Sequence, residues 1–291
     1  MSIEKNYFPM TNINIDKDLM DRDLYRIMPL DRFLQMLYTG HNILVHPSAW
    51  EDPYEKLISE SGWEYKGKKT KFDENPWFGQ SWSLNKSDDT MWRAYTNNAK
   101  TRAVQIKTTT DKIAAMLSDG KNYNKSVTYY LRKISYCPYD IHNVGEDVHP
   151  DYRNNDNLIF IDYVYQYYSK EIEQIVKNQN LVKEEQKALD KSIETLGLCL
   201  LTSKRNPFEH ENEVRLLAYM PQESTKENYT LHVELDKLID EVELDPWAPK
   251  EFVQPMKEII TNKLPKGIGV KHSNIYETPQ YFPLLKIGIN K

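Results

Sequence analysis

The chain has 291 residues, with 38 Lys and Arg against 43 Asp and Glu, and so a formal net charge of −5. Hydrophobic residues make up 40% of it and aromatic residues 12%, which excludes an intrinsically disordered chain. No stretch reaches the roughly 18 consecutive apolar residues of a membrane helix, and the N-terminus does not have the pattern of a signal peptide. Two cysteines cannot by themselves form a disulfide framework or a four-ligand zinc site. We therefore expect a cytoplasmic globular protein without a membrane partner.

The hydrophobic pattern predicts many short strands separated by a few helices. Strands are expected at 24–28, 43–46, 77–84, 102–109, 127–137, 213–220, 229–235 and 240–244, with further strands at the end of the chain. Helices are expected at 30–40, 90–99, 111–117 and 249–262, and a Lys-rich hairpin is expected near 66–71. From about 158 to 203 the pattern is helical, so a helical insertion interrupts the strands. The sequence therefore predicts an α+β fold, as a single elaborated domain over residues 1–291.

Several standard sites are missing from the sequence. It contains no Gly-rich phosphate loop, no HExxH and no GxSxG motif, and we expect no metal site. The stretch 100–133 carries eight basic residues against two acidic ones. Such blocks are usually solvated faces, although this one leaves a polyanionic partner possible.

Three small features indicate chemistry. Arg26 lies in the middle of an otherwise apolar strand, where its guanidinium needs either a neighbouring carboxylate or a ligand's pyrophosphate. Ser81 and Ser83 share one face of a strand, with an indole on the other face. Glu211 and Glu213 lead into a buried strand and are expected on one face, where repulsion can raise one pKa unless Arg215 neutralises them.

The order of these features resembles the R-S-E pattern of ADP-ribosyltransferases: Arg, then Ser-x-Ser, then Glu-x-Glu. ENEVRLL is also similar to the Glu-x-Glu-Val segment of their arginine-modifying members. Separately, about two thirds of the chain resembles a bacterial family of uncharacterised proteins, the domain of unknown function 2971. The matching segments are LYRIMPLDRFLQML (24–37), WEDPYE (50–55), SWSLNKSDDTMWRAY (81–95), ISY (134–136) and SKRNPFEHENEVRLL (203–217). That family typically has CFS at 81–83, a Gly at 101–102 and often a Trp at 208, where this chain differs.

The resemblance implies an ADP-ribosyltransferase-like split β-sheet core that binds NAD as the substrate, with Arg26 on the diphosphate and the two serines on the nicotinamide ribose. The residues expected to contact NAD are Tyr25, Arg26, Ser81, Trp82, Ser83, Trp92 and Tyr95. For Trp92 and Tyr95, packing of the following helix is an alternative to stacking on nicotinamide. Glu213 would stabilise the oxocarbenium-like ribose, and Glu211 would orient or deprotonate the acceptor.

The acceptor implied is a nucleic-acid base (DNA or RNA) or a protein side chain. Families of this kind include bacterial toxins and phage-defence effectors, which need an antitoxin or another inhibitory partner. Two other functions stay open. Asp52-Pro53 with Glu64-Tyr65-Lys66 superficially resembles the active site of a metal-dependent nuclease. The three motifs could also survive as an ion-pair network in a non-catalytic binding module.

Overall fold

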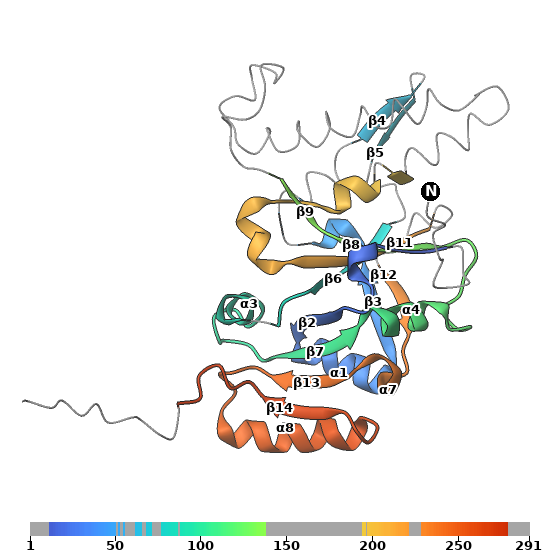
Figure 1. The fold of residues 1–291 in the computed structure, drawn as a ribbon. Helices are drawn as coiled ribbons and strands as arrows, with labels where there is room; N and C mark the ends of the chain where they lie inside the picture. Colours follow the sequence, from blue (N-terminus) through green and yellow to red (C-terminus); the bar gives the residue numbers. More distant parts are fainter. Residues whose placement is uncertain are drawn as a thin grey trace, which may run out of the picture.

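One mixed sheet dominates the computed structural model (Figure 1). Among the described residues, ten strands form it, in the order β1-β8-β11-β6-β2-β7-β13-β14, and β3 and β12 branch from β6. The structure describes residues 12–50, 52, 55, 62–65, 68–71, 77–86, 88–137, 194–195, 197–220 and 228–278.

The strands of the main sheet are short, at three to seven residues each. They are β1 (Ile13–Ile15), β2 (Asp23–Pro29), β3 (His41–Val45), β6 (Trp77–Ser83), β7 (Ala103–Thr109), β8 (Thr128–Lys133), β11 (Glu213–Tyr219), β12 (Asn228–His232), β13 (Glu241–Leu244) and β14 (Gly269–His272). Two small pairs lie apart from it, β4 (Gly62–Tyr65) with β5 (Lys68–Lys71) and β9 (Ser135–Cys137) with β10 (Ser203–Arg205). The α-helices are α1 (Leu30–Thr39), α3 (Asp89–Tyr95), α4 (Thr110–Ser118), α7 (Leu235–Leu238) and α8 (Lys250–Lys263). The 3-10 helices are η1 (Lys17–Leu19), η2 (Pro47–Ala49) and η6 (Asn206–Glu211).

The sheet divides at β6. One edge of β6 pairs along its whole length with β11, from Glu213 opposite Ser83 to Tyr219 opposite Trp77. Its other edge pairs with β2 at a single position, Tyr25 opposite Ser83, and with β3 at a single position further back. The β2 and β3 arms therefore separate from β6 and leave a fork between them. This branch confirms the expected α+β fold with a split sheet.

The core lies between the sheet and the helices. All seven residues of β11 are buried, and Val214, Leu216 and Ala218 on one face of it join the main apolar cluster. The helices add apolar side chains to this cluster, among them Phe33 and Leu37 of α1, Ile113 and Leu117 of α4, Leu238 of α7 and Ile260 of α8. The other face of β11 carries the buried charged residues Glu213 and Arg215, followed by Leu217 and Tyr219.

Most of the predicted elements are confirmed, with small shifts of their ends. Gly40 ends α1 in the left-handed conformation (φ 66°), as its position after the periodic residues predicted. The helix expected at 90–99 stops at Tyr95, because residues 97–99 all have positive φ and cannot continue a right-handed helix. β1 and β10 were not predicted. Of the expected insertion, 158–193 lies outside the described residues, while 194–195 and 197–201 are helical.

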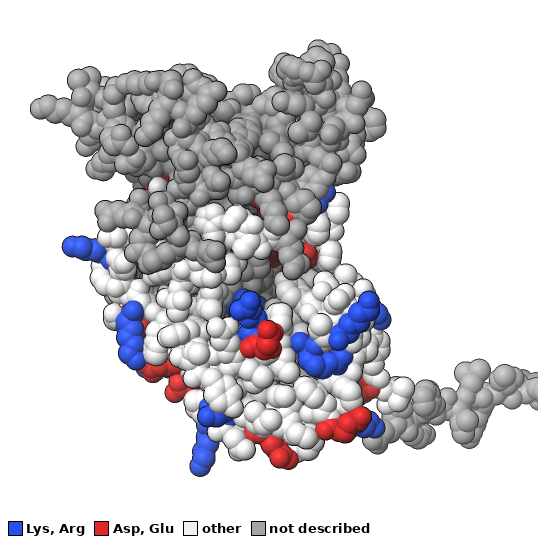
Figure 2. Space-filling model, turned by 180° about the vertical axis from the view of Figure 1, so that it is seen from behind, with Lys and Arg blue, Asp and Glu red and all other residues white. Residues whose placement is uncertain are grey.

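The basic block at 100–133 does not form a single positive surface. Four of its eight cations are paired with carboxylates from other parts of the chain: Arg102 with Asp245, Lys107 with Asp23, Lys112 with Asp240 and Arg132 with Asp16. On the face seen in Figure 2, blue and red side chains are interspersed. The block therefore gives no support for a polyanionic partner. Within the described ranges, no helix has the length and apolar character to cross a bilayer.

Candidate functional site

The three motifs meet on neighbouring strands. Tyr25 of β2, Ser83 of β6 and Glu213 of β11 lie opposite one another in a single row across the sheet. Arg26 follows Tyr25 at the point where β2 leaves β6, so its side chain stands at the fork. Residues separated by up to 188 positions in the chain are thus one or two strands apart, about 5 to 10 Å.

The Glu213 carboxylate is buried and fully hydrogen-bonded. Ser81 Oγ donates to its Oε1 at 2.6 Å, and Arg215 Nε donates to the same oxygen at 2.7 Å. Lys204 Nζ donates to Oε2 at 3.0 Å, and the residue is only 3% exposed. Burial on its own would raise the pKa of Glu213, but the charges of Arg215 and Lys204 and the hydrogen bonds lower it to about 2. The carboxylate is therefore a fixed negative charge that does not exchange protons near neutral pH.

Arg215 is the buried cation that orients the Glu213 carboxylate. Its side chain is 1% exposed, forms an ion pair with Glu55 and donates through Nη1 to the Leu201 carbonyl at 2.7 Å. The guanidinium also lies 4.3 Å from the centre of the Trp50 ring. Its Nε, Nη1 and Nη2 atoms all donate to described protein groups, so Arg215 orients Glu213 and ties it to the local fold.

Glu211 differs from the prediction in its position. It is the last residue of η6 and does not lie on the strand, because Asn212 adopts a left-handed conformation (φ 43°) between the two glutamates. Lys204 Nζ bridges both carboxylates, at 2.6 Å from Glu211 Oε2 and 3.0 Å from Glu213 Oε2. The expected shared strand face is therefore wrong. Since the Lys204 cation stands between the two carboxylates, their repulsion does not raise the pKa of Glu213, which is lowered.

Arg26 has an environment of the opposite kind. Its Nη1 donates to Asn42 Oδ1 at 3.4 Å, and its guanidinium carbon lies 6.0 Å from the centre of the Trp82 ring. Among the described residues, no carboxylate is within ion-pair distance of it. Burial of its surroundings lowers the pKa of Arg26 to about 10, so it remains charged at neutral pH. The side chain nevertheless keeps some accessible surface. It is a desolvated cation that no described carboxylate compensates, and its remaining accessible surface leaves it within reach of a ligand.

Tyr95 stands between these two environments. It is the last residue of α3, which packs beside β2 (Figure 1), and its side chain is 40% exposed. Burial of the hydroxyl and the charges of Glu213 and Glu211 together raise the pKa of Tyr95 to about 12, against the opposing charges of Lys204 and Arg26. Tyr95 is thus close to both ends of the site and accessible enough to contact a ligand.

Two of the residues predicted to contact NAD are buried in the core. Trp92 is 0% exposed and packs against Ile27 and Ala103, and Trp82 is 3% exposed within the main apolar cluster. Neither ring has a free face for a nicotinamide, so these two predictions are wrong as direct contacts. For Trp92 the alternative, packing of the helix, is the correct one. Trp82 instead supports the Arg26 guanidinium from inside the protein.

Strand alternation determines which of the remaining predicted residues can share a ligand. Ser81 and Ser83 point to the face of Glu213, and Ser83 Oγ donates to the Glu211 carbonyl at 2.7 Å. Gln80 and Trp82 point to the opposite face, toward Arg26. Tyr25 is half-buried in the row of Ser83, with Lys107 and Asp23 as its charged neighbours. Any one ligand of both Arg26 and Glu213 must therefore pass the end of β6, where Tyr95 lies.

Sequence reasoning missed several residues of the site. Lys204 and Tyr136, whose hydroxyl accepts from the Glu213 N–H at 2.8 Å, lie in the segments SKRNPFEHENEVRLL and ISY that carried the family resemblance. The presence of both residues in segments shared with the family could have indicated that they belong to the site. Glu55 ends WEDPYE, another of these segments, and so had the same signal. Asn42 and Gln80 had no signal of their own, because an isolated polar residue in an apolar stretch is common.

The residues of the nuclease alternative do not form a metal site in the described part of the chain. Asp52 pairs with Arg205 at 3.5 Å, and Glu64 lies on β4, in the hairpin predicted from the Lys-rich connector. The side chain of Glu64 and the whole of Lys66 lie outside the described residues. Among the residues that are described, no three His, Cys, Asp or Glu side chains gather around a possible metal position.

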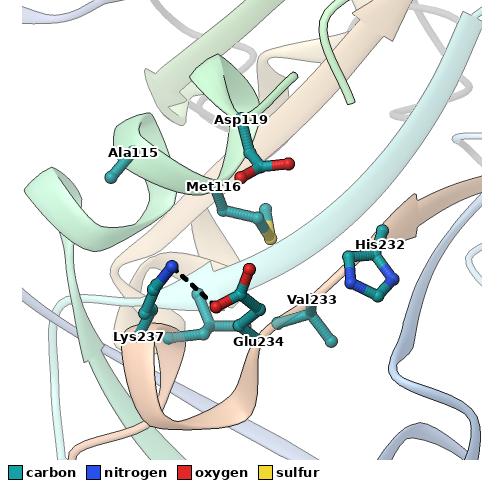
Figure 3. A pocket seen from close by; sticks show the side chains of 8 residues that line it. Ala115, Met116, Asp119, His232, Val233, Glu234 and Lys237 are labelled. Atoms are coloured by element: carbon teal, nitrogen blue, oxygen red, sulfur yellow. Dashed lines mark ion pairs between the residues drawn. The ribbon is translucent and has the colours of Figure 1, made fainter. Parts of the chain in front are cut away.

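A pocket of about 220 Å³ lies away from the candidate site, between α4, α7 and the end of β12 (Figure 3). Its lining combines apolar side chains with a charged rim: Ala115, Met116, Asp119, His232, Val233, Glu234, Lys237 and Leu238. Lys237 and Glu234 on its rim pair with each other at 2.6 Å. None of the candidate site residues named above lines it.

Comparison with protein families matches residues 91–216 to the model described as "Protein of unknown function (DUF2971)". The matched range includes Tyr95 and Glu213, and it confirms the family resemblance seen in the sequence. A search of curated proteins gave no match. Among solved structures the chain is similar to Thermus sp. 2.9 DarT in complex with carba-NAD+, at 8% identity and a TM-score of 0.33, over 88% of this chain and 98% of that one. A likeness this loose transfers no residue role.

Proposed function

We propose that this protein is an NAD-dependent ADP-ribosyltransferase that modifies a macromolecular acceptor. The observation that supports it is the meeting of the three motifs around the end of β6: a charged, uncompensated Arg26 on one side, and Glu213 hydrogen-bonded to Ser81 on the other. A guanidinium without a carboxylate suits a diphosphate. A fixed carboxylate suits a ribose that becomes positive.

In the proposed reaction the bond between ribose C1′ and the nicotinamide nitrogen breaks, and its electron pair leaves with nicotinamide. The ribose carbon becomes electron-poor and is attacked by a nucleophilic atom of the acceptor, which then loses its proton. Glu213 remains ionised throughout because its pKa is about 2, so its contribution is electrostatic. Removing one such preorganised group typically costs ~10²–10³ in rate.

Glu211 is the proposed contact for the acceptor. It is more accessible than Glu213, with 23% of its side chain exposed against 3%. Lys204 already occupies one of its oxygens at 2.6 Å, so the other is the one available to orient a base or a side chain or to accept its proton. The choice between a nucleic-acid base and a protein side chain is a matter for the assay.

The direct test is transfer from labelled NAD. Purified protein is incubated with NAD labelled in the adenylate, together with single-stranded DNA, RNA or a protein mixture, and nicotinamide release is measured in parallel. We expect label on one class of acceptor with the wild type and a loss of ~10²–10³ in Glu213→Gln. Equal nicotinamide release by both proteins would refute the role of Glu213, and no release on any acceptor would refute the function.

A non-catalytic binding module is the second candidate, and one observation favours it. Both carboxylate oxygens of Glu213 are occupied by Ser81, Arg215 and Lys204, which is how a purely structural ion-pair network is built. A module of this kind would bind the nucleotide without breaking it. Thermal stabilisation by NAD, which follows RT ln(1 + [L]/Kd), without nicotinamide release would favour it over the enzyme.

The family resemblance suggests a toxin or phage-defence role for the proposed enzyme. An enzyme that modifies a host macromolecule then needs an inhibitory partner or a trigger. Expression of the wild type is expected to arrest bacterial growth, while Glu213→Gln is tolerated at the same protein level. Equal tolerance of both proteins would argue against this role.

A further inference from the structure

Two buried amides, Asn42 of β3 and Gln80 of β6, fill the fork of the sheet beside Arg26. They are 2% and 4% exposed, and neither takes part in the proposed chemistry. Two hydrogen bonds join the two side-chain amides. Gln80 Nε2 donates to Asn42 Oδ1 at 2.7 Å, and Asn42 Nδ2 donates to Gln80 Oε1 at 3.2 Å. Two buried polar side chains in a fork lined by apolar strands need a reason to be there.

Fixed groups determine the orientation of this amide pair. Gln80 Nε2 also donates to the Ile43 carbonyl at 3.0 Å, which can only accept, and Gln80 Oε1 accepts from Trp82 Nε1 at 3.0 Å, which can only donate. All the donors and acceptors of the Gln80 amide are then used. Its orientation in turn dictates that of Asn42, whose oxygen is left facing Arg26 at 3.4 Å.

Within the described ranges, the Arg26 guanidinium is therefore held by neutral groups alone: the Asn42 oxygen and the face of the Trp82 ring, 6.0 Å from its carbon. A neutral oxygen orients the cation without cancelling its charge. A carboxylate at the same place would form an ion pair with it and make it unavailable to an anion. The remaining N–H groups of Arg26 have no partner among the described residues.

We propose that Asn42 and Gln80 are positioning residues that orient the Arg26 guanidinium toward the diphosphate of a dinucleotide and keep its charge free. The ligand class rests on the function proposed above, while the role of the amides in anion binding can be tested without any catalysis. Asn42→Asp has the size of the native residue but brings a carboxylate to Arg26. Asn42→Asp loses only the hydrogen bond that Nδ2 donates to Gln80 Oε1. Asn42→Ala removes all the hydrogen bonds of this side chain and adds no charge.

Binding of ADP-ribose, measured by calorimetry, separates these variants. We expect Asn42→Asp to weaken binding at least 10-fold with an unchanged or higher Tm, because the new ion pair stabilises the free protein. Asn42→Ala is expected to weaken binding only about threefold, with a lower Tm because a buried side chain is lost. A merely structural role would make affinity and Tm fall together and would make Ala the worse variant, and that order would overturn the proposal.

Two further variants test the same role if Asn42→Asp does not fold, and control for the introduced charge. Gln80→Met preserves volume but releases Asn42 from its fixed orientation, and it should weaken ADP-ribose binding even if Asn42→Asp does not fold. Asn14→Asp, a half-buried amide on β1 far along the sheet order from Arg26, is the matched control and should bind as the wild type does. If the wild type binds ADP-ribose and inorganic pyrophosphate but releases no nicotinamide from NAD, the transferase fails and the positioning role stands. If it binds neither, the positioning role is refuted.

Discussion

The two ends of the candidate site, around Glu213 and around Arg26, differ in whether the protein neutralises the buried charge. At the β11 end, the Glu213 carboxylate is surrounded by two cations and a hydroxyl, and its charge is stabilised by the protein itself. At the fork, the Arg26 cation is buried against neutral groups, and no carboxylate in the described part of the chain compensates its charge. The first arrangement stabilises the fold and can offer a fixed field. The second destabilises the free protein and is relieved only by an anion, which is a common trade-off at binding sites.

The largest effect is expected from removal of the Glu213 charge. Glu213→Gln is expected to lower ADP-ribose transfer by ~10²–10³ and also to destabilise the protein by about 3 kcal/mol, because Arg215 and Lys204 lose their shared partner. Nicotinamide release and thermal unfolding measure the two effects. Asn14→Asp, outside the site, is the control for both. A variant with normal Tm would mean that the network does not support the fold as its geometry indicates.

Removal of the Arg26 charge should not lower the stability of the free protein, in contrast to removal of the Glu213 charge. Arg26→Met is expected to raise the KM for NAD roughly 10- to 100-fold, because a hydrogen-bonded charge contact to the diphosphate is worth about 1.5–3 kcal/mol. Its Tm is expected to be equal to or higher than that of the wild type, since the desolvated cation is gone. Initial rates over a range of NAD concentrations and thermal unfolding give both values. If Tm falls as far as in Glu213→Gln, the two ends do not differ in the way described.

The sequence contained more information about the order of the elements than about their surroundings. Alternation of apolar residues predicted β2, β6 and β11, and the order of Arg, Ser-x-Ser and Glu-x-Glu correctly suggested that they meet. The same alternation put the indole of Trp82 on the face opposite the serines, which is where the structure has it. What could not be predicted was pairing at long range. Arg215 reaches Glu55 across 160 residues, and no periodicity relates such positions.

The position of Glu211 illustrates a second limit. Spacing by two residues predicts a shared face only if both residues lie on the strand. The left-handed conformation of Asn212 places Glu211 outside the strand, so the assumption fails. A single Asn can adopt this conformation without any change in the hydrophobic pattern of the neighbouring residues. The bridging cation, Lys204, comes from yet another element, β10, which was not predicted at all.

Acid should weaken the network at the β11 end. The pKa of Glu213 is about 2 in the folded protein against an ordinary value of 4.5, so its contribution to stability is complete above pH 4.5 and is lost as the pH falls toward 2. The difference in Tm between the wild type and Glu213→Gln should therefore shrink between pH 4.5 and 2.5. Thermal unfolding of both proteins over this range measures it, and the comparison cancels the titration of other carboxylates. A constant difference would mean that Glu213 is not held in its charged form.

The smallest effect is expected at the residue between the two ends. Tyr95→Phe removes only a hydroxyl that is near Arg26 and both glutamates, while the accessible ring remains. Loss of one neutral hydrogen bond is worth about 0.5–1.5 kcal/mol, so kcat/KM should fall roughly 2- to 12-fold with little change in Tm. Tyr95→Ala removes the ring as well and should cost more, because stacking on the ligand is then lost too. If both substitutions leave kcat/KM unchanged, the ligand does not pass the end of β6, and Arg26 and Glu213 do not act on the same molecule.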